Sequence, residues 1–228
     1  MVSLAELENP AVVVTSAHAG EGKTATCARL AQALARSGQR VVLVDLDLRH
    51  PDVHRWIGAA NDFGVSDVLL NERTLDSCLQ FVEAPGRGAK RGIYFLSAGK
   101  PVHEPTELLG TARLKKLLEG LGEQADVVLL DTPPVLPVAD TLVIGRMAGG
   151  VIIVAESRRT PAGAVLKVKD ALVANRARPL GVVLNKLQAR DVLYGYGYGY
   201  GMTQTEADGG EKPRADSNGH RGKGSSDA

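Results

Sequence analysis

The chain has 228 residues, of which 44% are hydrophobic and 4% aromatic, and its formal net charge is +1. This length supports one α/β domain with an aliphatic core and leaves no room for a second full domain. The near-neutral charge and the lack of a basic stripe interleaved with aromatic residues argue against a nucleic-acid partner.

The first predicted elements are a strand near residues 11–15 and a helix near residues 23–36, joined by a glycine-rich turn. The strand is rich in β-branched residues, and the helix carries apolar residues at helical spacing. The turn, Ala17 to Thr24, matches the phosphate-binding loop G-x-x-x-x-G-K-[ST], except that Ala17 replaces the first glycine. A chance glycine-rich turn is the alternative, but a strand before and a helix after are the context that a phosphate-binding loop requires.

Four residues of this turn have predicted roles in binding a nucleoside triphosphate. Gly20 and Gly22 let backbone N–H groups close around phosphate oxygens, and the following helix presents its positive N-terminal end. Lys23 would reach the β- and γ-phosphates, and Thr24 would offer its hydroxyl to Mg²⁺. The side chain of Glu21 is expected to point outward, away from the phosphates.

Two later strands are predicted to end in carboxylates. The second predicted strand leads into Asp45, Asp47 and Arg49, and a later one ends in Asp131. In a parallel sheet this edge is where ligands bind, and an aspartate there can hold a metal directly or through water. Single aspartates at strand ends are more often caps or turn residues, but several together favour a site. Arg49 fits either a phosphate contact or a salt bridge, and Asp140 either a helix cap or a catalytic group.

The remaining segments alternate between strand and helix patterns. This alternation predicts a parallel sheet covered by helices on both faces, so the expected fold class is α/β, doubly wound and mainly parallel, of the P-loop NTPase type. Tyr94 lies in a strand that is predicted to be buried, and we expect it in the core. The predicted strands lie near residues 11–15, 40–45, 93–97, 126–131, 150–155 and 180–184, and the predicted helices near 23–36, 65–71, 106–121, 138–147 and 161–175.

The C-terminal part changes character. Tyrosine alternates with glycine over residues 194–201, and residues 202–228 are polar, rich in glycine and serine, and predicted to be disordered. By composition alone, the repeat fits a low-complexity adhesive segment. Glycine at every second position also keeps the backbone mobile, so that the phenols could enter an active site one after another as phosphoryl acceptors. The candidate acceptors are Tyr194, Tyr196, Tyr198 and Tyr200.

Five segments together resemble the bacterial tyrosine kinases that act in capsule and exopolysaccharide synthesis. They are GEGKT at 20–24, VDLDLRHP at 44–51, PTELL at 105–109, LDTPP at 130–134 and the tyrosine cluster. The resemblance covers about residues 10–201 and implies ATP-dependent autophosphorylation of the tail tyrosines, exchanged between protomers. It implies a P-loop tyrosine kinase domain over residues 1–193, followed by the cluster at 194–201 and the tail at 202–228.

The resemblance also assigns roles to individual residues. Lys23 and the loop amides would hold the phosphates of ATP, and Thr24 and Asp131 would organise Mg²⁺. Asp45 and Asp47 would bind metal or would orient and deprotonate the phenol, whose unperturbed pKa is about 10. The expected sets are Lys23, Asp45, Asp47 and Asp131 for catalysis; Thr24, Asp45 and Asp131 for metal; and Gly20, Glu21, Gly22, Lys23, Thr24, Thr26, Arg49 and Asn185 for cofactor contact.

Two other functions stay open. A partitioning or positioning ATPase of the Min/Par type is disfavoured because such proteins carry a signature lysine where this chain has His18. The second alternative is an adaptor that binds nucleotide with little turnover. GTP is disfavoured as the nucleotide because the sequence from Asn185 to Gln188, NKLQ, lacks the aspartate of the N-K-x-D motif.

Location and partners follow partly from the residues and partly from the resemblance. Cys27 and Cys78 fit no metal or disulfide pattern, which indicates a reducing compartment. The N-terminus lacks the features of a signal peptide, and the apolar stretch from Leu142 to Ala155 is too short to span a membrane and contains Arg146. We therefore expect a cytoplasmic protein. The resemblance implies recruitment to the inner face of the membrane by a membrane-anchored polysaccharide co-polymerase or activator. It also implies a homo-oligomer, although no E-x-x-R-x-x-R assembly motif precedes the loop. A cognate tyrosine phosphatase is the third partner that it implies.

Overall fold

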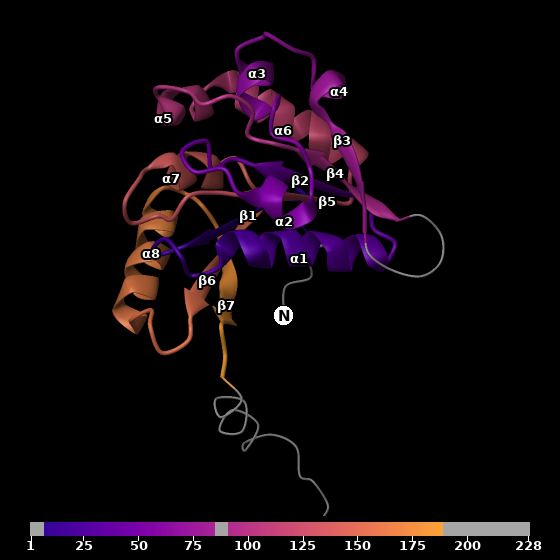
Figure 1. Cartoon of the computed structure of the whole chain (residues 1–228). Helices are drawn as coiled ribbons and strands as arrows, with labels where there is room; N and C mark the ends of the chain where they lie inside the picture. Colours follow the sequence, from indigo (N-terminus) through magenta and orange to yellow (C-terminus); the bar gives the residue numbers. More distant parts are fainter. Residues whose placement is uncertain (1–6, 85–90, 189–228) are drawn as a thin grey trace, which may run out of the picture. The chain divides into compact units, whose positions relative to one another are not determined.

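The computed structural model describes residues 7–84 and 91–188 (Figure 1). The tyrosine–glycine cluster at 194–201 and the tail at 202–228, which was predicted to be disordered, lie outside the described residues. The residues of the candidate nucleotide site all lie within the described ranges.

The centre of the fold is a seven-stranded sheet in the order β3-β4-β2-β5-β1-β6-β7. Every neighbouring pair is parallel except β3 and β4, which are antiparallel. The predicted mainly parallel sheet is confirmed, and the short strand β3 was not predicted. The strands are β1 (Ala11–Ser16), β2 (Val41–Asp45), β3 (Gln80–Glu83), β4 (Gly92–Leu96), β5 (Val127–Asp131), β6 (Gly150–Glu156) and β7 (Pro179–Asn185).

Eight helices are present in the described part of the chain. The single helix predicted over 106–121 is wrong, because the chain leaves the helical conformation at Thr111, whose φ of −77° and ψ of 154° are extended, and forms two helices instead. Two short helices were not predicted, those that begin at Val53 and Leu75. The helices are α1 (Lys23–Arg36), α2 (Val53–Ile57), α3 (Val65–Leu69), α4 (Leu75–Cys78), α5 (Pro105–Leu109), α6 (Ala112–Gln124), α7 (Asp140–Gly145) and α8 (Ala162–Ala174).

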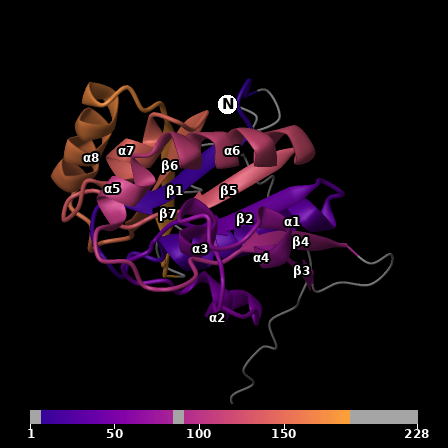
Figure 2. The same ribbon diagram turned by 90° about the horizontal axis from the view of Figure 1, so that it is seen from above.

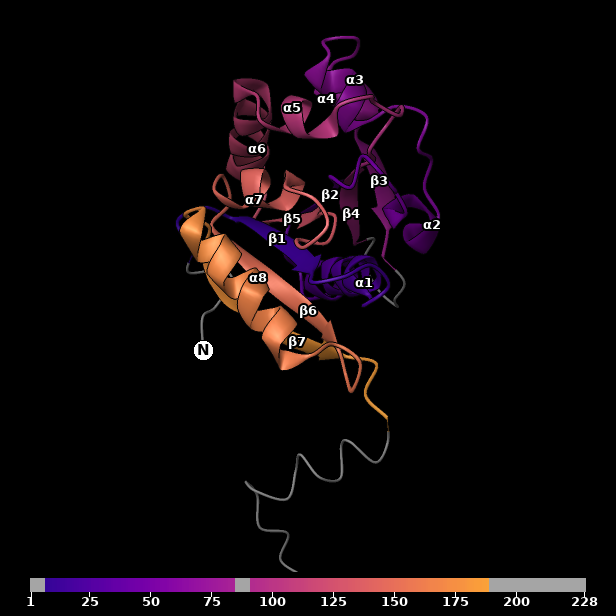
Figure 3. The same ribbon diagram turned by 90° about the vertical axis from the view of Figure 1, so that its left-hand side faces the viewer.

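Helices cover both faces of the sheet, which makes the fold doubly wound. On one face α1 and α2 pack against the alternate residues of the central strands, such as Val12, Leu43 and Leu129. On the other face α3 to α8 contribute to a second cluster that includes Val13 and Leu130. Figure 2 looks onto the layer that contains α5, α6 and α7, and Figure 3 shows α8 alongside β6 and β7.

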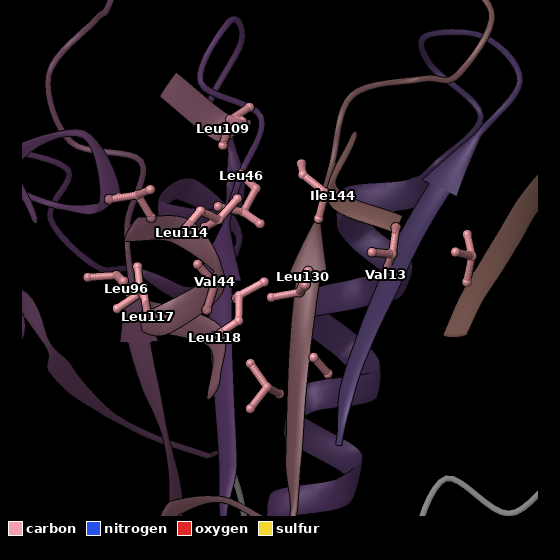
Figure 4. Packing of buried hydrophobic residues seen from close by; sticks show 14 of the residues in the cluster. Val13, Val44, Leu46, Leu96, Leu109, Leu114, Leu117, Leu118, Leu130 and Ile144 are labelled. Atoms are coloured by element: carbon pink, nitrogen blue, oxygen red, sulfur yellow. The ribbon is translucent and has the colours of Figure 1, made fainter. Parts of the chain in front are cut away.

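Helix α6 illustrates how the sequence specifies this packing. Its residues Leu114, Leu117, Leu118 and Leu121 recur at helical spacing, so they form one apolar stripe, and all four are buried in the cluster on this face of the sheet. Figure 4 shows the first three of them. The central strands β1, β2 and β5 are buried on both faces, which explains their continuous apolar sequences. Because these three strands run parallel, their carboxyl ends meet at one edge of the sheet.

Tyr94 corrects one prediction about the core. It lies on β4 as predicted, but its exposed fraction is 51%, because β4 buries Ile93 and Phe95 and turns the residue between them outward. Its ring meets the exposed ring of Phe81 on β3 edge to face, with centroids 5.4 Å apart. Tyr94 is therefore a surface tyrosine.

Candidate functional site

The loop between β1 and α1 has the geometry of an anion site. Gly20 and Gly22 adopt positive φ values of 84° and 93°, which glycine reaches without steric cost. A Cβ on Gly22 would lie 2.1 Å from Nδ2 of Asn185, so a larger residue there would displace the Asn185 side chain as well as strain the backbone. Among the described residues, no group accepts a hydrogen bond from the backbone N–H groups of Gly20 to Thr24. These free donors at a helix N-terminus fit a phosphate.

Lys23 lies between two carboxylates at the start of α1. Its Nζ is 3.0 Å from Oδ2 of Asp47 and 3.6 Å from Oδ2 of Asp131. Burial by itself would lower the pKa of Lys23, but the carboxylates of Asp131, Asp47 and Asp45 outweigh burial and raise it. The ammonium group is therefore fully charged at neutral pH.

Asp131 has one oxygen engaged and one without a partner. Its Oδ2 accepts a hydrogen bond of 2.8 Å from Oγ1 of Thr24, whereas its Oδ1 is buried and has no hydrogen-bond partner in the described part of the chain. Burial raises the pKa of Asp131 to about 6, against the opposing effects of Lys23 and Thr24. An unpartnered carboxylate oxygen beside a threonine hydroxyl fits Mg²⁺, which takes few protein ligands together with substrate phosphates. Within residues 7–84 and 91–188, no cluster of three or more His, Cys, Asp or Glu could hold a metal ion by itself.

Asp45 pairs with Asp131 across β2 and β5, as expected from strands whose ends meet at one edge. Its Oδ1 accepts the backbone N–H of Asp47 at 3.1 Å, and its Oδ2 accepts that of Val53 at 3.2 Å. Burial and then the charge of Asp131 raise its pKa well above the ordinary range of an aspartate. Asp45 thus fixes the start of α2 to the end of β2. A role for Asp45 in metal binding or as a base would have to compete with these two hydrogen bonds.

Arg49 forms the salt bridge that was one of its two predicted roles. Its Nε and Nη2 donate to the two oxygens of Asp140 at 2.7 and 3.1 Å, and Nη2 also donates to Oγ1 of Thr106 at 3.0 Å. Asp140 is fully buried and begins α7 without capping it, so the predicted cap is wrong. Arg49 nevertheless lines the cleft, which leaves its guanidinium group available to a ligand.

The side chain of Glu21 does not point outward as predicted. It is 5% exposed, and its carboxylate accepts hydrogen bonds from the backbone N–H of His18 and from Oγ1 of Thr160. Thr160 gave no signal in the sequence, since the contact spans 139 residues. Glu21 therefore stabilises the loop, and only its backbone is placed to contact phosphate.

The last residue of β7 and the residue that follows it also hold the loop. Asn185 donates from Nδ2 to the carbonyl oxygen of Glu21 at 3.0 Å. Lys186, which was not predicted, donates from Nζ to the carbonyl oxygen of Gly20 at 2.7 Å and to Glu156 at 2.8 Å. Asn185 lines the cleft, whereas the hydroxyl of Thr26 donates to the carbonyl of Gly22 and serves the loop itself.

Several of these residues line one open cleft of about 1290 Å³, whereas Asp131, Asp45 and Glu21 are not part of its lining. The phosphate-binding loop, Asp47 and Arg49 line one part of it, and residues of α1 and α2 line another. The cleft therefore joins the anion site to a second wall built by helices.

The pKa of Asp131 predicts how the metal-free protein responds to pH. Because its folded-state pKa is raised, the folded protein holds this proton more tightly than the unfolded chain, so stability falls as pH rises from about 4 to about 6. Asp131→Asn should flatten this part of the profile and raise stability at pH 7 by up to about 3 kcal/mol, measured by urea unfolding. The charged groups that face residue 131 are Lys23, Asp45 and Asp47, and this variant does not alter them.

A surface aspartate, Asp126, provides a control in which replacement by asparagine should change stability in the opposite direction. Hydrogen bonds from Arg40 lower the pKa of Asp126, so its stabilising contribution is lost as pH falls into the acid range. Asp126→Asn should therefore lower stability at neutral pH slightly. A pH profile of stability that Asp131→Asn leaves unchanged would contradict the effect of burial on Asp131.

Comparisons with known proteins agree with the geometry. Residues 12–194 match the family model of the CobQ/CobB/MinD/ParA nucleotide binding domain. The chain is 35% identical over 174 residues to the tyrosine-protein kinase YwqD of Bacillus subtilis, covering 76% of this chain and 71% of YwqD. It is 30% identical over 191 residues to the tyrosine-protein kinase ptk of Acinetobacter johnsonii, covering 83% of this chain but only 24% of that protein.

Two solved structures extend the comparison. The kinase domain of the Escherichia coli tyrosine kinase ETK superposes with a TM-score of 0.73 at 30% identity, covering 86% of this chain and 74% of that one. The cell division ATPase MinD of Pyrococcus furiosus has a TM-score of 0.66 at 23% identity, covering 80% of this chain and 75% of that one, and shares the fold.

Proposed function

This chain belongs to the bacterial tyrosine-protein kinases built on the CobQ/CobB/MinD/ParA nucleotide binding domain, and we propose that it transfers the γ-phosphoryl group of Mg-ATP to tyrosines of its own C-terminal cluster. The acceptors are Tyr194, Tyr196, Tyr198 and Tyr200, and the process regulates the synthesis and export of a capsular or exopolysaccharide. The observation that carries the proposal is the position of Lys23, between Asp47 and Asp131 and next to the hydroxyl of Thr24.

The residues of the site have separate roles in the proposed phosphoryl transfer. The N–H groups of the loop and Lys23 bind the phosphates, while Thr24 and Asp131 would hold Mg²⁺, which would supply positive charge against the phosphate oxygens. Asp47 accepts the phenol proton as the tyrosine oxygen bonds to phosphorus and the bond from phosphorus to the ADP oxygen breaks. Asp47 suits this role better than Asp45, since Asp47 lines the cleft and Asp45 does not.

The experiment that tests this function is an intact-mass measurement after incubation with Mg-ATP, followed by tryptic mapping. Added phosphate on the peptide that contains residues 194–200 supports the kinase. Hydrolysed ATP with an unmodified chain would instead support the Min/Par-like ATPase, and neither change would support the adaptor that binds nucleotide with little turnover.

Loss of the Asp131 carboxylate is expected to affect metal-dependent binding selectively. Asp131→Asn keeps an oxygen for the Thr24 hydroxyl but removes the negative charge, so it should weaken Mg-ATP binding about ten-fold or more while ADP without Mg²⁺ binds almost as before. Isothermal titration with each nucleotide measures both. Equal losses for the two nucleotides would indicate a packing role for Asp131.

The proposed setting is the inner face of the membrane. No helix within residues 7–84 and 91–188 is long and apolar enough to cross a bilayer. We propose that a membrane-anchored co-polymerase recruits and activates the chain, that copies of the chain assemble into a homo-oligomer, and that a cognate phosphatase reverses the modification.

This dependence on a partner gives a kinetic prediction. If assembly or a partner segment completes the active site, autophosphorylation by the isolated chain should be slow and should rise with protein concentration. The measurement is the initial rate of labelling across a dilution series. A fast rate per molecule that does not depend on concentration would contradict the proposal.

A further inference from the structure

The cleft extends beyond the phosphate-binding loop to a wall of aromatic and basic side chains. This wall consists of Arg29 on α1 with Arg55 and Trp56 on α2, and all three line the cleft. Trp56 is the only tryptophan of the chain, and 45% of it is exposed. None of these residues takes part in the phosphate, metal or proton-transfer roles proposed above. We refer to these three residues as the indole wall.

The indole wall is anchored to the catalytic edge of the sheet. The backbone N–H of Val53, the first residue of α2, donates to Asp45, whose neighbour across the sheet is Asp131. The backbone N–H of His50 donates to Oδ1 of Asp47 at 3.0 Å. Since Asp47 also accepts a hydrogen bond from Lys23, the segment that leads into α2 and the ammonium group contact the same carboxylate. A ligand that touches α2 therefore has a fixed position relative to the transferred phosphate.

The side chains of the wall hold one another in place. Trp56 donates from Nε1 to Oδ2 of Asp52 at 3.1 Å, and Arg55 donates to the other oxygen of Asp52 at 3.3 Å. The guanidinium carbon of Arg29 lies 5.8 Å from the centroid of the Trp56 ring, within the range of a cation–π contact. Arg29 and Arg55 carry two positive charges and Asp52 carries one negative charge, so the net charge of the wall is positive. The indole ring of Trp56 adds an aromatic surface.

We propose that the indole wall is a binding site for the acceptor segment, a tyrosine–glycine strand. The inference rests on the proposed kinase function. When one tyrosine of such a strand enters the site, the next tyrosine lies two residues away, about 7 Å along an extended chain. Its ring stacks on Trp56, and glycine between the tyrosines lets the backbone approach the cleft without side-chain clashes.

The charge of the wall gives it a second role once transfer has begun. A phosphotyrosine carries about 1.5 to 2 negative charges, and arginine binds phosphate in a planar, bidentate geometry. Arg29 and Arg55 are therefore placed to hold a tyrosine that is already phosphorylated while its unmodified neighbour occupies the site. The indole wall thus favours successive modification of neighbouring tyrosines.

A binding experiment tests the wall without any turnover. The probe is a synthetic peptide with the sequence of residues 194–201, unmodified or phosphorylated on its first tyrosine, titrated into the full chain without ATP. Because Trp56 is the sole tryptophan, its fluorescence reports binding at the wall directly. We expect saturable quenching, tighter for the phosphopeptide, that persists when the chain is saturated with Mg-ADP. Quenching by ADP and not by peptide would overturn the proposal and assign the wall to the adenine base.

A kinetic experiment tests the same site by phosphoryl transfer to the peptide. The background is a chain with Tyr194→Ser, Tyr196→Ser, Tyr198→Ser and Tyr200→Ser, so that the added peptide is the tail acceptor. Trp56→Ala should raise the KM for peptide about five-fold, with kcat and the affinity for ADP unchanged, and Trp56→Phe should restore most of the loss. Arg29→Ala should raise the KM for the phosphopeptide more than for the unmodified peptide.

Arg73 offers a matched control. Its guanidinium carbon lies 3.5 Å from the ring centroid of Phe63, so Arg73→Ala removes the same kind of contact outside the cleft. It should leave the KM for peptide unchanged. If Trp56→Ala and Arg29→Ala both leave the KM for peptide at the wild-type value, the proposal is overturned. Peptide binding with no transfer by the wild-type chain would leave the indole wall standing and refute the kinase function instead.

Discussion

Replacement of Lys23 by methionine is expected to lower both nucleotide turnover and tail phosphorylation by about a hundred-fold or more. The reason is electrostatic, since Lys23→Met removes the only cation that the described structure places between Asp47 and Asp131, at the N-terminus of α1. The side chain length is nearly conserved, so the effect reports the charge. Phosphotyrosine immunoblots and ATP hydrolysis by the purified variant measure the two losses.

The structure also specifies the controls for this variant. Removing the ammonium group leaves two buried carboxylates without their cation, which costs stability, so the fold of Lys23→Met must be checked by circular dichroism and thermal unfolding. Lys115→Met changes an exposed lysine on α6 whose contact is a surface ion pair with Glu119, and it should behave as wild type. Undiminished phosphotyrosine in a folded Lys23→Met protein would refute the role of Lys23.

The sequence was sufficient to predict the main elements and the meeting of the carboxylates. The strands that end in Asp45 and Asp131 are apolar throughout, which predicts burial on both faces in a parallel sheet, and such a sheet gathers its carboxyl ends at one edge. The structure places these two residues directly opposite each other on β2 and β5. The loop, with Gly20 and Gly22 in left-handed conformations, followed from its motif.

The features that could not be predicted depend on long-range contacts or on short segments. The buried position of Glu21 depends on Thr160, and the role of Asp45 as an anchor depends on the backbone of Val53, so neither leaves a local pattern. Strand β3 has only four residues, too few for a clear alternation of polar and apolar side chains. Tyr94 was misplaced because a strand pattern does not say which face of a strand is left uncovered by helices.

The exposure of Tyr94 changes how autophosphorylation must be measured. The chain has five tyrosines, and Tyr94 is the one outside the tail cluster. Because Tyr94 is exposed on β4, total phosphotyrosine would count any modification of Tyr94 together with that of the tail. Tryptic mapping, or the variant Tyr94→Phe, separates the two sources.

Transfer between copies of the chain is expected to be the dominant route to tail phosphorylation. Near the end of the described residues, Asn185 and Lys186 lie beside the phosphate-binding loop and donate to its carbonyl groups. A flexible segment of about ten residues spans roughly 15–20 Å on average, so transfer within one chain must be tested against transfer to a neighbour. Mixing resolves the two, because Lys23→Met cannot act as a donor and a chain with all four tail tyrosines changed to phenylalanine cannot act as an acceptor.

In that mixture, the Lys23→Met chain should become phosphorylated on residues 194–200, at a rate that rises with the concentration of the donor. Each phosphotyrosine adds about 1.5 to 2 negative charges. Arg29 and Arg55 can hold one phosphotyrosine, but four within seven residues exceed these two charges and repel one another and a site that contains Asp45, Asp47 and Asp131, so the fully modified tail should leave the cleft and the assembly should weaken. Sedimentation velocity should then show a smaller species after phosphorylation. If the Lys23→Met chain stays unlabelled under conditions in which the wild-type chain labels fully, transfer takes place within one chain. The assembly would then have no reason to depend on phosphorylation.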